Sequence, residues 1–240
     1  PVSFVGGLNG DSTTSPISIS SYWIYTYANL PTDTYALWQQ VGPSAAMPAG
    51  QGYLMKGAGT SMGLEQNYTF KGKPHNSSSK DPITLSIDGG NDYLVGNPFP
   101  SAMDARAFIL ANPHLNGSLY FWDHWGGDSH EISQYQAGWA TLTLMSSVRA
   151  ASARGTSTAT NSTQRPGANI AVGQGFFVFA DTTGDIIFDN DQRTFVRESV
   201  ATDDVIFMFD QDQDTEETAD RAALPNGKEE NDANGVDTRP

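Results

Sequence analysis

The residue types best suited to chemistry gather in one glycine-rich segment, DHWGGDSHE, at residues 123–131. Imidazole and carboxylate groups together suit a borderline metal ion, but their spacing here matches no helical ligand pattern. Polar residues around a Gly-Gly turn explain the segment equally well, which disfavours a transition-metal site. Trp125 is the tryptophan most expected to be exposed, and an exposed indole ring can contact a ligand by stacking. We therefore predict ligand contacts at Asp123, His124 and Trp125.

A second candidate site is an alternating run of aspartates, Asp210, Asp212 and Asp214. Oxygen ligands recur at every second position of calcium-binding loops, so these carboxylates are the predicted ligands if the chain binds calcium. The EF-hand pattern breaks at once, because Thr215 and Arg221 stand where that loop needs glycine and glutamate. A solvated acidic run beyond a last strand is the alternative interpretation.

Recognisable catalytic motifs are missing from the sequence. It contains no GxSxG nucleophile elbow, no phosphate-binding glycine loop and no HExxH helix. It also contains no cysteine, which excludes thiol nucleophiles, disulfides and cysteine-ligated zinc. Acidic residues are numerous enough for a glycosidase, but none stands in a catalytic motif. We predict that the protein is not an enzyme and needs no cofactor other than the calcium considered above.

Composition narrows the range of partners. The chain has 240 residues and a formal net charge of −14, half of which falls in residues 210–240. Such an acidic protein lacks the basic surface that nucleic acids and anionic membranes require. No apolar run approaches the roughly 20 residues of a membrane helix, so we expect no membrane insertion. A charged content of 17% and an aromatic content of 11% are typical of folded, β-rich proteins.

Strand signals recur along the chain between residues 22 and 209. Short β-branched or aromatic runs are each bounded by Gly, Pro, Asn or Asp. One helix is predicted over residues 102–111, with Ser101 before it and Asp104 as the capping-box acid. Residues 146–167 are rich in Ser, Thr and Ala without aromatics, and we predict a long surface loop there.

An internal repeat organises these strands. Residues 50–55 read GQGYLM, and residues 173–178 read GQGFFV. Each copy follows an aromatic strand and then a strand around a tryptophan, Trp38 or Trp139, in the same order. Glycines on both sides of the glutamine suit a close approach of two backbones, so we interpret the motif as architectural.

Together these patterns predict an all-β fold of two related sandwich-like or jelly-roll-like units with one short inserted helix. The first unit comprises residues 1–90 and the second residues 91–209, with the helix at 102–111. Residues 210–240 follow as an acidic tail.

Several motifs resemble those of a known group of proteins. They include LVGNPFPSA at 94–102, YQAGWA at 135–140, VGQGFFV at 172–178 and FDNDQR at 188–193. In this order they resemble large exported surface proteins of Bacteroidota, which are typically secreted by the type IX system and carry a C-terminal sorting domain. The resemblance implies an extracellular β module at the cell surface, with no catalytic residues to carry over. The sequence departs from that group after Phe209, where no sorting domain is recognisable.

The predicted function is therefore a non-catalytic extracellular module for adhesion or for assembly of a surface structure, exported by type IX secretion. Its expected partners are other copies of the chain or other surface proteins, with glycans as a further class. The alternative is a carbohydrate-binding module of an exported polysaccharide-processing protein, in which aromatic rings stack on sugars.

Overall fold

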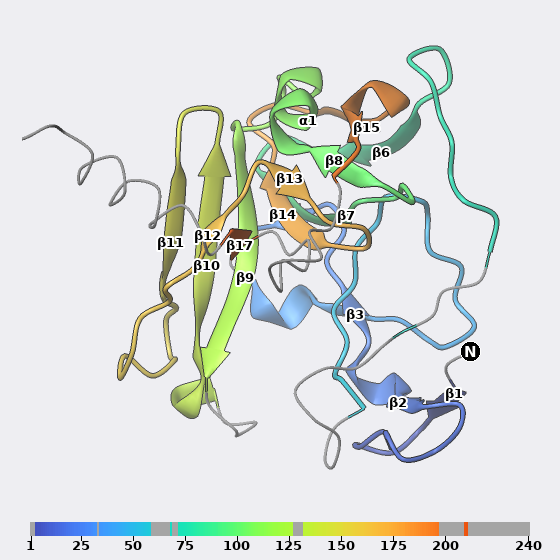
Figure 1. Ribbon diagram of the computed structural model, residues 1–240, viewed down its shortest axis with the longest axis vertical. Coiled ribbons are helices and arrows are strands. Elements are labelled where there is room, and N and C mark those ends of the chain that lie inside the picture. The colour runs from blue at the N-terminus through green and yellow to red at the C-terminus, as the bar shows by residue number, and fades with distance from the viewer. Residues whose placement is uncertain are drawn as a thin grey trace, which may run out of the picture. The chain divides into compact units, whose positions relative to one another are not determined.

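Antiparallel strand pairing dominates the computed structural model of the chain (Figure 1). The structure describes residues 3–32, 34–58, 68, 72–126, 132–196 and 209–210. The chain divides into two units, Pro1–Asp210 and Gln211–Pro240, and the described residues belong to the first. Within them, one short α-helix, α1 (Ala105–Ala111), accompanies the strands and 3-10 turns, so the predicted all-β fold with a single short helix is confirmed.

A six-stranded antiparallel sheet forms one layer of the fold. Its strands lie in the order β11 (Ser147–Ser152), β10 (Gln136–Thr143), β9 (Ser118–Gly126), β14 (Gly175–Phe179), β7 (Asn91–Gly96) and β4 (Leu30–Pro31). Figure 1 shows β9, β10 and β11 as three long neighbouring strands. β14 and β7 continue the sheet beside β9 and bring two distant parts of the chain together.

Smaller sheets complete the described part of the chain. One has three strands, β13 (Asn169–Ile170), β8 (Ala102–Asp104) and β16 (Arg193–Thr194). The antiparallel pairs are β15 (Gly184–Phe188) with β6 (Ile83–Ile87), β3 (Tyr25–Thr26) with β5 (Gln39–Gln40), and β12 (Arg165–Pro166) with β17 (Phe209–Asp210). β1 (Ser3–Val5) pairs in parallel with β2 (Ser18–Ser20). The 3-10 turns are η1 (Ser21–Trp23), η2 (Tyr35–Leu37), η3 (Ile132–Gln134) and η4 (Asn190–Gln192).

The core lies between the inner face of the six-stranded sheet and the layer of α1, β6 and β15. Phe121 and Phe176 project into it from the sheet, Phe108 from α1 and Phe188 from β15, and each ring is at most 1% exposed. The ring centroid of Phe108 lies 5.4 Å from that of Phe176 and 5.2 Å from that of Phe188. These contacts join the sheet, the helix and β15 in a single core.

The helix begins later than the sequence predicts. Residues 102–104 form β8, and Asp104 is the N-cap, because its carboxylate accepts hydrogen bonds from the backbone N–H groups of Arg106 (2.8 Å) and Ala107 (3.1 Å). Met103 in β8 is fully buried and pairs with strands on both sides. The predicted range 102–111 is wrong over its first three residues because this pairing overrides the helix signal.

The predicted surface loop at 146–167 is also partly wrong, since it contains β11 and β12. β11 pairs antiparallel with β10 and forms an edge of the six-stranded sheet. The two backbones approach closely at Gly138, where a Cβ atom would lie 1.8 Å from the carbonyl oxygen of Ala151. β11 was not predicted because serine and alanine give little strand signal, and the strand forms here through its pairing with β10.

The two GQG segments lie on opposite edges of β7. Val95 in β7 pairs with Gln51 on one side and with Phe176 on the other. Gly50 and Gly173 open the two segments with positive φ angles of 85° and 73°, a conformation that favours glycine. At both places the motif therefore provides the glycine backbone conformation that lets the segment pair with β7.

Strands around the two GQG segments pair in matching register. In each copy a tyrosine of the first strand pairs with two residues: the one two places after the tryptophan of the next strand (Trp38 or Trp139), and the fifth residue of the GQG segment. The residues are Tyr25, Gln40 and Leu54 in the first copy, and Tyr120, Thr141 and Phe177 in the second. This match supports the predicted duplication, although the division into two sandwich-like units stays a prediction. Strand pairing between β4 and β7 and between β6 and β15 crosses the predicted boundary at residue 90.

We expect the substitution Gly52→Ala to destabilise the fold. A Cβ atom there would lie 2.7 Å from the carbonyl oxygen of Val95, a backbone atom that cannot rotate away. The free energy of unfolding, measured by chemical denaturation, should fall by about 1–3 kcal/mol. Gly42→Ala is the matched control, because no atom lies within 4 Å of a Cβ atom built there. Equal losses in the two variants would contradict this explanation of the motif.

Candidate functional site

The three predicted ligand contacts lie on β9, where His124 faces away from Asp123. Asp123 is only 6% exposed, and its carboxylate accepts a hydrogen bond from the Ser162 hydroxyl. His124 is exposed on the opposite face of the strand. The indole Nε1 of Trp125 is 3.1 Å from the Thr160 hydroxyl oxygen, to which it donates. The structure therefore does not bring the three side chains into one site, and residues 127–131 of the same segment lie outside the described residues.

The predicted calcium ligands fall mostly outside the described part of the chain. Asp210 lies in β17, where its backbone pairs with Arg165 of β12. Asp212 and Asp214 lie outside the described residues. Among the residues that are described, no group of three or more His, Cys, Asp or Glu side chains could hold a metal ion. Calcium binding by the three aspartates stays a prediction.

A row of aromatic rings crosses the outer face of the six-stranded sheet, the face opposite the core. We call it the aromatic ridge, and it comprises Trp122 of β9, Trp139 of β10, Phe177 of β14, and Trp38 and Tyr27 of the N-terminal segment. Successive ring centroids in this order lie 4.9, 5.3, 5.8 and 5.4 Å apart. The rings therefore form one continuous contact chain across segments that are distant in sequence.

The ridge is open at one end and covered at the other. Trp122 and Trp139 are 41% and 40% exposed, whereas Tyr27 is buried. Neighbouring rings meet at steep angles, 67° between Trp122 and Trp139 and 85° between Trp139 and Phe177. Edge-to-face contacts of this kind are favourable, but they leave the rings without a common plane.

The sequence prediction missed the two open tryptophans, because it singled out Trp125 as the tryptophan most expected to be exposed. Strand alternation is the signal that could have found them. In β9, Leu119, Phe121 and Asp123 face inward, so Trp122 faces outward. Cross-strand register then places Trp139 directly opposite Trp122.

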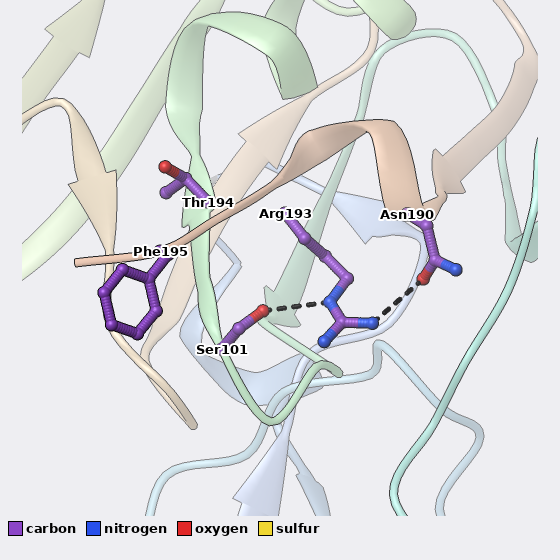
Figure 2. Close-up of a pocket in the computed structure, with 5 residues that line it drawn as sticks. All are labelled: Ser101, Asn190, Arg193, Thr194 and Phe195. Carbon is purple, nitrogen blue, oxygen red and sulfur yellow. Dashed lines mark hydrogen bonds between the residues drawn. The ribbon is translucent and has the colours of Figure 1, made fainter. Parts of the chain in front are cut away.

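A separate hollow of about 330 Å³ lies beside η4 and β16 (Figure 2). Its lining residues are Ser101, Asn190, Arg193, Thr194 and Phe195. Figure 2 shows the Arg193 guanidinium between Ser101 and Asn190. Arg193 Nε donates to the Ser101 hydroxyl at 3.0 Å, and its Nη1 donates to the Asn190 side-chain oxygen at 3.4 Å. Sequence reasoning did not find this site, because its residues come from two segments about ninety positions apart.

The fold and these two surface features define an all-β domain with one sheet face in the core and the other carrying the aromatic ridge. Over residues 8–234 the chain matches the model of a family described as a domain of unknown function (DUF8693), and it belongs to that family. No curated protein and no solved structure matches the chain. In the part of the chain that the structure describes, no helix has the length and apolar character needed to cross a membrane.

One histidine away from the ridge has a perturbed environment. The His114 ring lies against Gly184, and its Nε2 is buried without a hydrogen-bond partner. Loss of water around the ring lowers the pKa of His114 below its usual 6.5, and the nearby Asp185 carboxylate opposes this effect only in part. The neutral imidazole is therefore the form that the fold prefers.

We expect His114 to make stability depend on pH. Because its pKa is lower in the folded protein, the unfolded chain binds more protons between the two pKa values. Its contribution to stability is full above pH 6.5 and is lost as the pH falls through the folded-state pKa. In unfolding measurements over a pH series, His114→Phe should flatten this dependence, while His75→Phe, at an exposed position, should not. An unchanged pH dependence in His114→Phe would refute the assignment.

Proposed function

We propose that this chain is a non-catalytic module of an exported surface protein, and that it serves adhesion or assembly through the aromatic ridge. The resemblance to type IX-exported proteins of Bacteroidota supports an extracellular location at the cell surface. The observation that carries the proposal is the open end of the ridge, where Trp122 and Trp139 pack together at 4.9 Å while about two fifths of each remains exposed. Adjacent exposed tryptophans are typical anchors of protein interfaces.

The strand neighbours of the open end favour contact between copies of the chain. Cross-strand register places Ala151 beside Trp139, and Val148 beside Thr141, on the same face. These neighbours are uncharged, and Val148 is 58% exposed. A protein with a net charge of −14 repels its own copies, so association needs a surface where carboxylates are not brought together. The open end of the ridge meets that requirement.

Carbohydrate binding by the same face is the second candidate. It is supported by the exposure of two indole rings, which can cover the apolar face of a sugar. The angle of 67° between these rings gives no flat platform for an extended glycan. This geometry makes assembly through interlocking side chains the better-supported function.

The test is sedimentation velocity over a concentration series, comparing the wild type with the Trp122→Ala/Trp139→Ala double variant. We expect the wild type to self-associate more tightly as salt screens its charge, and the double variant to lose at least about thirtyfold in affinity, corresponding to about 2 kcal/mol. Leu110→Ala is the matched control, since Leu110 is an exposed apolar residue of α1 on the other layer.

A parallel glycan-array measurement separates the two functions. If the wild type is monomeric and binds glycans, and the double variant loses that binding, the function of the ridge is carbohydrate binding and not assembly. A monomeric wild type that binds no glycan would contradict both functions for the ridge. If the double variant still self-associates as the wild type does, copies of the chain do not contact each other through the ridge.

A further inference from the structure

Arg193 is a fixed cation with no partner of opposite charge among the described residues. Its guanidinium contacts are the hydroxyl of Ser101, the amide oxygen of Asn190 and the ring of Phe99, whose centroid lies 5.7 Å from the guanidinium carbon. All three contacts are uncharged groups. Arg193 itself is half-buried, in a chain with a net charge of −14.

The surrounding side chains hold the guanidinium in one orientation. Asn190 is itself fixed, because its amide nitrogen donates to the Asn76 side-chain oxygen at 2.9 Å and its oxygen accepts from the backbone N–H of Ser77 at 3.3 Å. Phe99 is 2% exposed and gives a rigid surface beneath the cation. An arginine positioned in this way loses little further conformational freedom when it binds a ligand.

The hydrogen bonds of Arg193 leave the outer end of its guanidinium available. Nε and one N–H of Nη1 are engaged, while Nη2 makes no hydrogen bond within the described residues. One N–H of Nη1 and both N–H groups of Nη2 therefore remain, and carboxylate oxygens can accept from them. The unused hydrogen-bond donors of Arg193 therefore suit a ligand that carries a carboxylate group.

The rest of the hollow suits a sugar that carries this carboxylate. Ser101 and Asn190 contribute polar side-chain atoms to its lining, while the Thr194 hydroxyl points away from the guanidinium (Figure 2). The Phe195 ring is 89% exposed, and Figure 2 shows it on the opposite side of Ser101 from the guanidinium. An exposed ring can cover the C–H face of a pyranose. The hollow is shallow and largely open to solvent, with a volume of about 330 Å³.

We propose that the hollow formed by Ser101, Asn190, Arg193, Thr194 and Phe195 binds a sugar acid, with the carboxylate on Arg193 and the sugar ring against Phe195. The negative field of the whole protein opposes dense polyanions, so a single uronic acid unit fits the site better than a heavily sulfated chain. This site is separate from the aromatic ridge and does not depend on the function proposed for it.

The test is titration calorimetry of the full chain with glucuronate, glucose and acetate. We expect saturable binding of glucuronate, and at least about tenfold weaker binding of glucose, which lacks the carboxylate, and of acetate, which lacks the sugar ring. Arg193→Gln should lower the affinity for glucuronate by about tenfold or more. Arg154→Gln is the matched control, because Arg154 is exposed and its side chain makes no hydrogen bond within the described residues.

A second variant keeps the test decisive if Arg193→Gln unfolds. Phe195→Ala removes an almost fully exposed ring, so it should preserve folding while weakening glucuronate binding several-fold. The Trp122→Ala/Trp139→Ala variant should bind glucuronate as the wild type does, which separates this site from the ridge. Equal affinity for glucuronate and glucose, equal affinity for glucuronate and acetate, or unchanged binding in Phe195→Ala would each overturn the proposal.

Discussion

The alternation of two adjacent phenylalanines in β14 governs both faces of this protein. Phe176 is 1% exposed and contacts the rings of Phe108 and Phe121 in the core. Burying such a ring stabilises a fold by several kcal/mol, about 3–5 kcal/mol when judged by truncation to alanine. Because successive side chains of a strand point to opposite faces, the same constraint directs Phe177 outward into the aromatic ridge. Core packing therefore positions the ridge.

The second requirement is close backbone packing around β7. Gly52 approaches the carbonyl oxygen of Val95 on one edge of this strand, while β14 pairs along the other. This arrangement brings the N-terminal segment against the outer face of the sheet, where Trp38 and Tyr27 contact Phe177 at 5.8 and 5.7 Å. The ridge is thus assembled from distant segments, and its covered end depends on the glycines of one GQG motif.

Sequence patterns predicted local structure better than they predicted the candidate sites. The β-rich class, the central helix residues and the strand at β14 follow from composition and periodicity, which are local properties. The first turn of the predicted helix was wrong because Met103 is drawn into β8 by pairing with β13 and β16. Asp123, His124 and Trp125 are adjacent in sequence, and strand alternation turns His124 away from the other two. Asp123 and Trp125 instead contact Ser162 and Thr160 of one segment. Arg193 and Ser101 meet only through the tertiary fold, so no local pattern could predict their contact.

We propose that copies of the chain meet through the open end of the ridge. Hydroxyl-radical footprinting read by mass spectrometry measures this directly, because it reports the solvent access of individual tryptophans in dilute and concentrated protein. The account predicts that oxidation of Trp122 and Trp139 decreases as the protein associates, while oxidation of the exposed Tyr22 stays constant. Equal oxidation of Trp122 and Trp139 in the dissociated and associated protein would contradict it.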